Sequence, residues 1–142
     1  MEISEIRQRV LQTIAESRRA AAARRARVDA ASAAYETFLE RVAMPIFKQF
    51  ASILKVEHYP FQVFTPGGGL RLASDRTSGD FIELVLDVSG DEPVVLGRTS
   101  RTRGSRALTS ERVLSEGTPV AELADADVLE FLLREIRPFV ER

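Results

Sequence analysis

The sequence has no cysteine and no tryptophan, and His58 is its single histidine. Without cysteine the chain has no disulfides, no thiolate metal sites and no thiol nucleophiles. One histidine is too few for a histidine-rich metal site, and any Ser-His-Asp triad would have to use His58. We therefore expect neither a metal nor another cofactor, and the residue types single out no catalytic group.

Long hydrophobic runs are also missing. No uninterrupted apolar stretch approaches the roughly 18 residues that a membrane span needs, and no apolar segment precedes a cleavage site. We expect a cytoplasmic protein without a membrane span. The 142 residues suit one domain, and a domain of this length buries roughly 68–70% of its unfolded surface without needing staples.

Glycine and proline are absent between residues 2 and 44, where the strong helix formers Ala, Arg, Glu, Leu and Gln dominate. A helix of about 40 residues would be about 60 Å long, which is more than the remaining chain can cover. We therefore divide the chain into a long helix over residues 1–44 and a compact α+β domain over residues 45–142.

Apolar and small residues recur along this helix at heptad spacing, interrupted by Arg7, Ser17 and Arg24. Because the helix needs something to pack against, the pattern predicts that copies of the chain associate through it as a homodimer or higher oligomer. Its small residues would allow a second helix to approach closely, in an antiparallel arrangement among others. The predicted contact positions are Ile3, Val10, Ile14, Ala21, Val28, Ala31, Tyr35 and Phe38.

Pro45 interrupts the helix, since proline lacks a backbone donor and disfavours helix in the residue before it. We expect a kink at Pro45 or a new helix that begins there. The apolar face that follows would suit a membrane surface, but we favour docking on the core because strands come next. This face consists of Ile46, Phe47, Phe50, Ile53 and Leu54.

Residues 60–115 read as an antiparallel meander of four or five strands, because short β-rich runs alternate with turn residues. Near the C-terminus, Asp127 and Glu130 suggest the start of a helix. Together these elements predict an α+β fold with helices on one face of the sheet. The expected strands are 60–65, 70–74, 80–88, 93–103 and one within 106–115. The C-terminal helix is expected to bury Leu129, Leu132, Leu133, Ile136 and Val140, with Val128, Phe131 and Phe139 beside them.

Three motifs that can carry chemistry have simpler explanations here. The glycines at 67–69 lack the Lys-Ser/Thr and the helix of a phosphate loop, so a hairpin turn is favoured. The acidic turns at 75–80 and 87–92 lack the ligand spacing of a calcium loop. His58 follows a helix end, where capping or exposure accounts for it better than catalysis.

The near-neutral net charge of −1 conceals two arginine clusters without acids. Eighteen of the twenty basic residues are Arg, a bias typical of GC-rich bacterial genomes. Arg clusters can serve as solvated faces, pair with acids of a partner chain, or contact nucleic-acid phosphates. In the second cluster we expect an exposed edge strand whose charges resist aggregation. The two clusters comprise Arg18, Arg19, Arg24, Arg25 and Arg27, and then Arg98, Arg101, Arg103 and Arg106.

The sequence leads to three hypotheses about function. The first is a non-enzymatic assembly protein that homo-oligomerises through its N-terminal helix and presents an Arg-lined domain to an unidentified protein partner. The second is a nucleic-acid-associated protein that uses both Arg clusters on phosphates, which the near-neutral charge and scarce aromatics disfavour. The third is a small enzyme or ligand-binding subunit whose site carries no recognisable motif.

Overall fold

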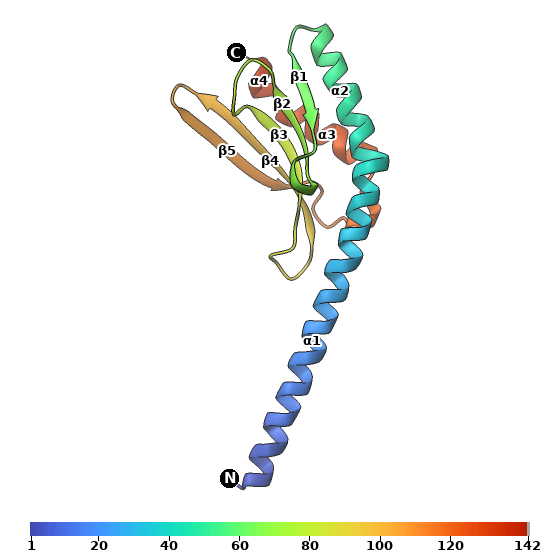
Figure 1. Cartoon of the computed structure of the whole chain (residues 1–142), viewed down its shortest axis with the longest axis vertical. Helices are drawn as coiled ribbons and strands as arrows, with labels where there is room; N and C mark the ends of the chain where they lie inside the picture. Colours follow the sequence, from blue (N-terminus) through green and yellow to red (C-terminus); the bar gives the residue numbers. More distant parts are fainter. Residues whose placement is uncertain (142) are drawn as a thin grey trace.

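The computed structural model describes residues 1–141 and shows a long helix, a five-stranded sheet and two C-terminal helices (Figure 1). This confirms the expected α+β fold. The helices are α1 (Ile3–Phe38), α2 (Met44–Val56), α3 (Asp125–Glu135) and α4 (Arg137–Val140). The strands are β1 (Phe61–Phe64), β2 (Leu70–Ser74), β3 (Phe81–Asp87), β4 (Val94–Arg103) and β5 (Arg106–Val113).

The chain remains helical as it passes Pro45. A single π-helical turn, Leu39–Ala43, joins α1 to α2, and Pro45 lies in the first turn of α2. Proline cannot donate the usual hydrogen bond to the carbonyl four residues earlier, and a wider turn is one way in which a helix accommodates this loss. A new helix therefore begins beside Pro45 as expected, but without a break in the helical path.

The sheet is an antiparallel meander in which each strand pairs with the next, in the order β1-β2-β3-β4-β5. Helices α2 and α3 lie against one face, which we call the covered face, and leave the other face open (Figure 1). The expected edge position of the second Arg cluster was wrong for its first part. Arg98 lies in the part of β4 that pairs with both β3 and β5, whereas Arg101 and Arg103 pair only with β5, which forms the edge of the sheet.

The core lies between the covered face and the helices, where Leu72, Leu84 and Leu132 are fully buried. Helix α3 turns a narrower face to this core than the sequence predicted. Val128 and Phe131 are buried as expected, but Leu129 and Leu133 are 42% and 44% exposed. Leu129 follows the buried Val128, and one residue along a helix is about 100° around its axis, so the Leu129 side chain turns away from the core.

Helix α3 also begins earlier than expected. Its first residue is Asp125, so Asp127 lies in the first turn and is not the capping residue. The carboxylate of Asp127 instead reaches back and accepts a hydrogen bond from the backbone N–H of Ala124 at 2.9 Å. This contact satisfies one donor at the start of the helix, which is half of a capping box.

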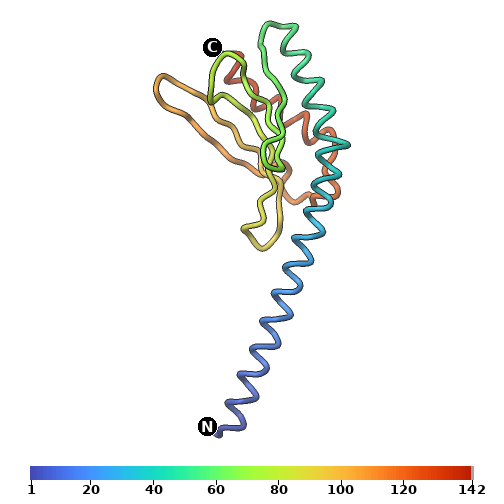
Figure 2. Tube along the Cα trace, viewed as in Figure 1, coloured from blue at the N-terminus to red at the C-terminus, as the bar shows by residue number. Residues whose placement is uncertain are grey.

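Helix α1 is attached to the domain only near its C-terminal end. Tyr35 and Phe38 are buried in the core, and the Tyr35 hydroxyl donates to the backbone carbonyl of Leu84 in β3 at 3.3 Å. Closer to the N-terminus, the guanidinium of Arg24 donates to the carbonyl of Val88 at 3.2 Å. Residues 3–23, which we call the arm, extend beyond the domain (Figures 1 and 2).

Gly97 in β4 gives a test of the packing between the sheet and α3. A Cβ atom added there would overlap the ring of Phe131. We expect Gly97→Ala to lower the free energy of unfolding by about 1–3 kcal/mol, the usual cost of overpacking a core. Urea unfolding measures this loss. In the matched variant Gly90→Ala the new Cβ meets nothing closer than 3.9 Å, and an equal loss in both variants would contradict the packing argument.

Tyr35 gives a test of how α1 is anchored. Burial, followed by the negative charge of Glu83, raises its pKa from 10.0 to about 12. Between those two values the unfolded state loses the phenolic proton while the folded state keeps it, so this contribution to stability falls as pH rises. Relative to Tyr35→Phe, the wild-type chain should lose about 1 kcal/mol of unfolding free energy between pH 9 and pH 11. A constant difference between the two proteins in urea unfolding would refute this.

Candidate interaction surfaces

The arm carries a row of exposed apolar side chains. Ile3, Ile6, Val10 and Ile14 are between 42% and 86% exposed, and at 100° per residue they fall within about 80° of the helix circumference. We call this row the apolar stripe. Ile6 was missed in the sequence because it lies outside the strict heptad alternation, although its spacing of three from Ile3 places it on the same side.

The remaining predicted contact positions of α1 divide into two groups. Ala21 is exposed on the arm, whereas Val28 and Ala31 are half-buried where the helix meets the domain. Tyr35 and Phe38 are 5% and 4% exposed and belong to the core of their own domain. Those two side chains are therefore already occupied by contacts within the chain itself.

The Arg cluster of α1 begins on the arm and ends at the domain. Arg24 binds the carbonyl of Val88, and Arg27 lies 3.9 Å from Glu92, so both hold the β3–β4 loop. Arg24 therefore binds the β3–β4 loop from a heptad position that an oligomerising helix would normally fill with Leu or Ile. The other members, Arg18, Arg19 and Arg25, are exposed and make no ion pair within the described chain.

A row of alternating charges crosses the open face of the sheet. The register places Arg71, Glu83, Arg98 and Glu111 side by side on four successive strands. Both Nε and Nη2 of Arg71 contact Oε2 of Glu83, at 2.9 and 2.8 Å, and Nε of Arg98 lies 2.8 Å from Oε1 of Glu111. The Arg98 N–H is not aligned for a hydrogen bond, so that contact is an ion pair alone. Arg98 is thus neutralised within its own sheet.

Phe81 lies beside this row and is the aromatic residue that the sequence suggested for stacking on bases. The Arg71 guanidinium lies over its ring, with Cζ 3.9 Å from the centroid. A cation in that position takes the place that a stacked base would need. This arrangement weakens the case for nucleic-acid binding on the open face.

The rest of the second Arg cluster surrounds the tip of the β4–β5 hairpin. Arg103 and Arg106 face each other across the turn, and Arg101 lies two residues from Arg103 on the covered-face side. Among the described residues none of the three has an acidic partner within 4 Å. Like charges directly opposite each other destabilise a strand pair, so the three arginines form a surface that would be stabilised by an anion.

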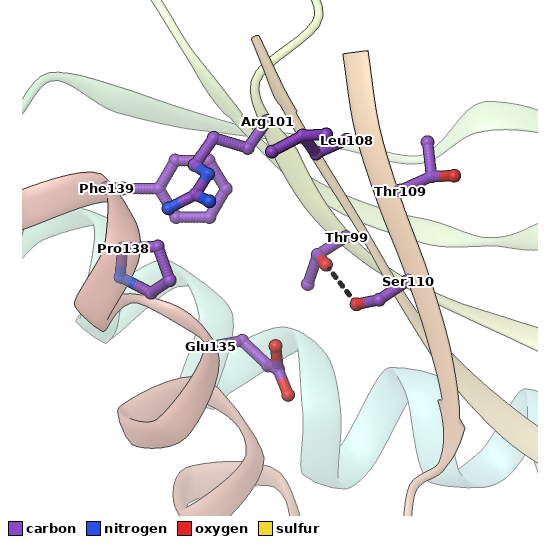
Figure 3. A pocket seen from close by; sticks show the side chains of 8 residues that line it. All are labelled: Thr99, Arg101, Leu108, Thr109, Ser110, Glu135, Pro138 and Phe139. Atoms are coloured by element: carbon purple, nitrogen blue, oxygen red, sulfur yellow. Dashed lines mark hydrogen bonds between the residues drawn. The ribbon is translucent and has the colours of Figure 1, made fainter. Parts of the chain in front are cut away.

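A groove runs along the hairpin between these arginines and the C-terminal helices. It consists of two hollows of about 180 and 390 Å³ that share Arg101 and Pro138. Figure 3 shows the first hollow, where Glu135 of α3 points toward Thr99 and Ser110, whose hydroxyls are hydrogen-bonded at 2.7 Å. Glu135 is 8% exposed and lies 3.1 Å from Nε of Arg112. The groove therefore has the buried Glu135 at one end, and Arg101 and Arg103 together with Glu141 at the other.

His58 lies apart from the surfaces described above. His58 has a φ of +70° and ends α2 on the surface, in the left-handed position that glycine usually takes after a helix. Across residues 1–141, no three His, Cys, Asp or Glu side chains are grouped so that they could hold a metal ion. Within the same range, no helix has the length and apolarity to cross a membrane.

The charge row provides a stability test, because its two ion pairs differ in burial. The Glu83 side chain is 8% exposed, whereas those of Arg98 and Glu111 are 42% and 55% exposed. Arg71→Ala leaves a buried carboxylate without its partner and should cost about 2–3 kcal/mol. The matched change Arg98→Ala breaks an exposed pair and should cost less than about 1 kcal/mol. Equal losses in thermal or urea unfolding would show that the burial of Glu83 does not matter.

Comparisons with known proteins found no similar protein. No family model, no curated protein and no solved structure matches the chain. Any statement about function must therefore rest on the arm, the charge row and the hairpin groove themselves.

Proposed function

We propose that the protein is a non-enzymatic assembly protein that homo-oligomerises through its arm and presents the Arg-lined β4–β5 hairpin to a protein partner. The observation that carries the proposal is the apolar stripe, four regularly spaced side chains on a helix that extends past its own domain. Helices in proteins are stabilised mainly by packing an apolar face against something. The domain provides such packing for Tyr35 and Phe38 but not for residues 3–23.

A second copy of the chain is the simplest partner for the stripe, because every copy carries the same surface. The stripe also points in the same direction around the helix as Val28 and Tyr35, which face the domain. A second helix on the stripe would therefore continue the line of contacts that already holds α1. Association would remove Ile3, Ile6, Val10 and Ile14 from water, and the hydrophobic effect favours this removal.

The hairpin tip supplies the second part of the proposal. Arg101, Arg103 and Arg106 have no acidic partner among the described residues, and guanidinium groups bind carboxylates through paired hydrogen bonds. Leu108 and Pro138 add apolar surface to the groove beside them. An acidic peptide segment of another protein has the chemistry that this surface would recognise.

The nucleic-acid hypothesis has less support. Of the arginines it invokes, Arg24 and Arg27 hold the β3–β4 loop and Arg98 is paired with Glu111. The ring of Phe81 is covered by Arg71. Phosphate binding would therefore depend on Arg18, Arg19 and Arg25 of the arm together with the hairpin tip, without an aromatic platform for bases.

Charge placed in the apolar stripe tests the proposed oligomerisation. We expect the wild-type chain to be a dimer or larger species in chromatography with light scattering at micromolar concentration. The double change Ile6→Glu and Val10→Glu would put four carboxylates into each dimer contact, and burying unpaired charge is costly. The variant should be a folded monomer, with an apparent dissociation constant raised at least about tenfold.

The control variant carries the same charge on the opposite side of the arm. Gln8→Glu and Gln12→Glu lie about 160–200° around the helix from the stripe, and both side chains are exposed. This variant should remain associated. A monomeric wild-type chain, or dissociation of both variants alike, would overturn the proposal.

A further inference from the structure

We infer that two arms pair antiparallel, with the twofold axis at the level of residue 12 and the two domains at opposite ends of the pair. This inference rests on the proposed homo-oligomerisation and specifies its geometry. It follows from three features of α1: where the arm ends, how large and small residues are distributed along it, and how its charges are distributed.

The β3–β4 loop sets the limit of the pairing surface. Arg24 contacts the carbonyl of Val88, and Arg27 lies close to Glu92. Those two contacts mark the place where the domain begins to occupy the side of α1 that carries the stripe. A second helix can therefore lie along residues 3–23 before it meets the loop. Two identical arms of this length overlap fully only if their midpoints, near residues 12 and 13, coincide.

The distribution of side-chain size fits an antiparallel pair centred there. The large residues Ile3 and Val10 occupy the N-terminal half of the arm, Ile14 lies just past its midpoint, and Ser17 and Ala21 follow in the C-terminal half. With the axis at residue 12, Ile3 lies opposite Ala21 of the second copy, and Val10 lies opposite Ile14. The layers Ile3–Ala21 and Val10–Ile14 then combine a large residue with a small one or two of medium size. Ile6 lies level with Arg18, whose long side chain can extend past it to solvent.

The same register keeps the polar heptad positions from facing one another as like charges. Arg7 lies opposite Ser17, which leaves room for the Arg7 side chain to extend to solvent. Moving the axis by half a heptad, to between residues 15 and 16, would instead place Arg7 opposite Arg24. It would also bring Ile3 against Val28, which is half-buried at the domain. Both consequences disfavour that alternative.

The charges favour the antiparallel arrangement over the parallel one. Residues 18–27 contain five arginines and no acid, whereas residues 1–6 contain Glu2 and Glu5 and no Arg or Lys. In a parallel pair the two Arg segments would lie next to each other, ten cations in all. In the antiparallel pair the two Arg segments lie at opposite ends, and the two helix dipoles oppose each other. Arg18 and Arg19 lie level with residues 6 and 5 of the other arm, near Glu5, and the remaining arginines lie past its N-terminus.

The chain has no native cysteine, so single introduced cysteines can determine the orientation. In the antiparallel pair, Ile3→Cys and Ala21→Cys chains should not form disulfide-linked dimers separately, because like positions lie about 27 Å apart along the axis. When equal amounts of the two variants are mixed, refolded together and oxidised, a mixed disulfide should form in about half of the dimers, the share expected from random pairing. Non-reducing gels distinguish the products, and light scattering before oxidation reports whether each variant is a dimer.

Each alternative gives a different result. In a parallel dimer each variant would cross-link with itself and the mixture would form no mixed product, which would overturn the inference but not the proposed function. A dimer without any cross-link would also overturn it, since the arms would not be in contact. A monomer in light scattering would overturn the proposed function itself.

A spin label provides a second measurement that leaves the stripe intact. Ala22→Cys places the label on an exposed position of the arm outside the contact layers. Pulsed electron resonance should give a distance of about 30 Å or more in the antiparallel pair, from ten residues on each side of the axis. A distance below about 20 Å would indicate parallel arms and contradict the inference.

Discussion

The burial of Tyr35 and Phe38 at one end of α1 is the constraint on which the rest of the molecule depends. Those two side chains fix the helix against β3 and the core, and the rigidity of an α-helix transmits that position to residues more than 30 residues earlier. The arm therefore leaves the domain in a defined direction, and its apolar stripe lies on a defined side. Without that anchor the stripe would be an amphipathic segment with no fixed relation to the hairpin groove.

Most of the fold could be predicted from the sequence because its signals are local. The long helix, the strand alternation of Ile82, Leu84 and Leu86, and the turn residues between strands all act over a few positions. The errors arose where the outcome depends on distant partners. Whether Leu129 is buried depends on which side of α3 faces the core, and which strand forms the edge depends on the strand order. No local pattern records either.

The candidate surfaces were only partly accessible to sequence reasoning, for the same reason. The proposed oligomerisation positions of the arm were identified from their spacing. Tyr35 and Phe38 have the same spacing, and the sequence could not show that they are core residues, because a core and an interface are filled by the same residue types. The arginines were recognised as two clusters in sequence. Their division in space, with Arg24 and Arg98 paired locally and Arg101 and Arg103 without acids, requires the register and the loop positions.

The apolar stripe and the hairpin tip require different properties of the chain, and the fold provides both. The proposed antiparallel contact of about 20 residues per arm would need a stiff helix to stay in register. The tip of the β4–β5 hairpin lies far from α1 (Figure 1), and the proposed partner binding needs only that its arginines stay accessible. With the axis at residue 12, the two Arg24 residues where the domains begin lie about 36 Å apart. In the proposed pair each hairpin tip would remain free on its own domain, so that assembly through the arms would not compete with the proposed partner binding.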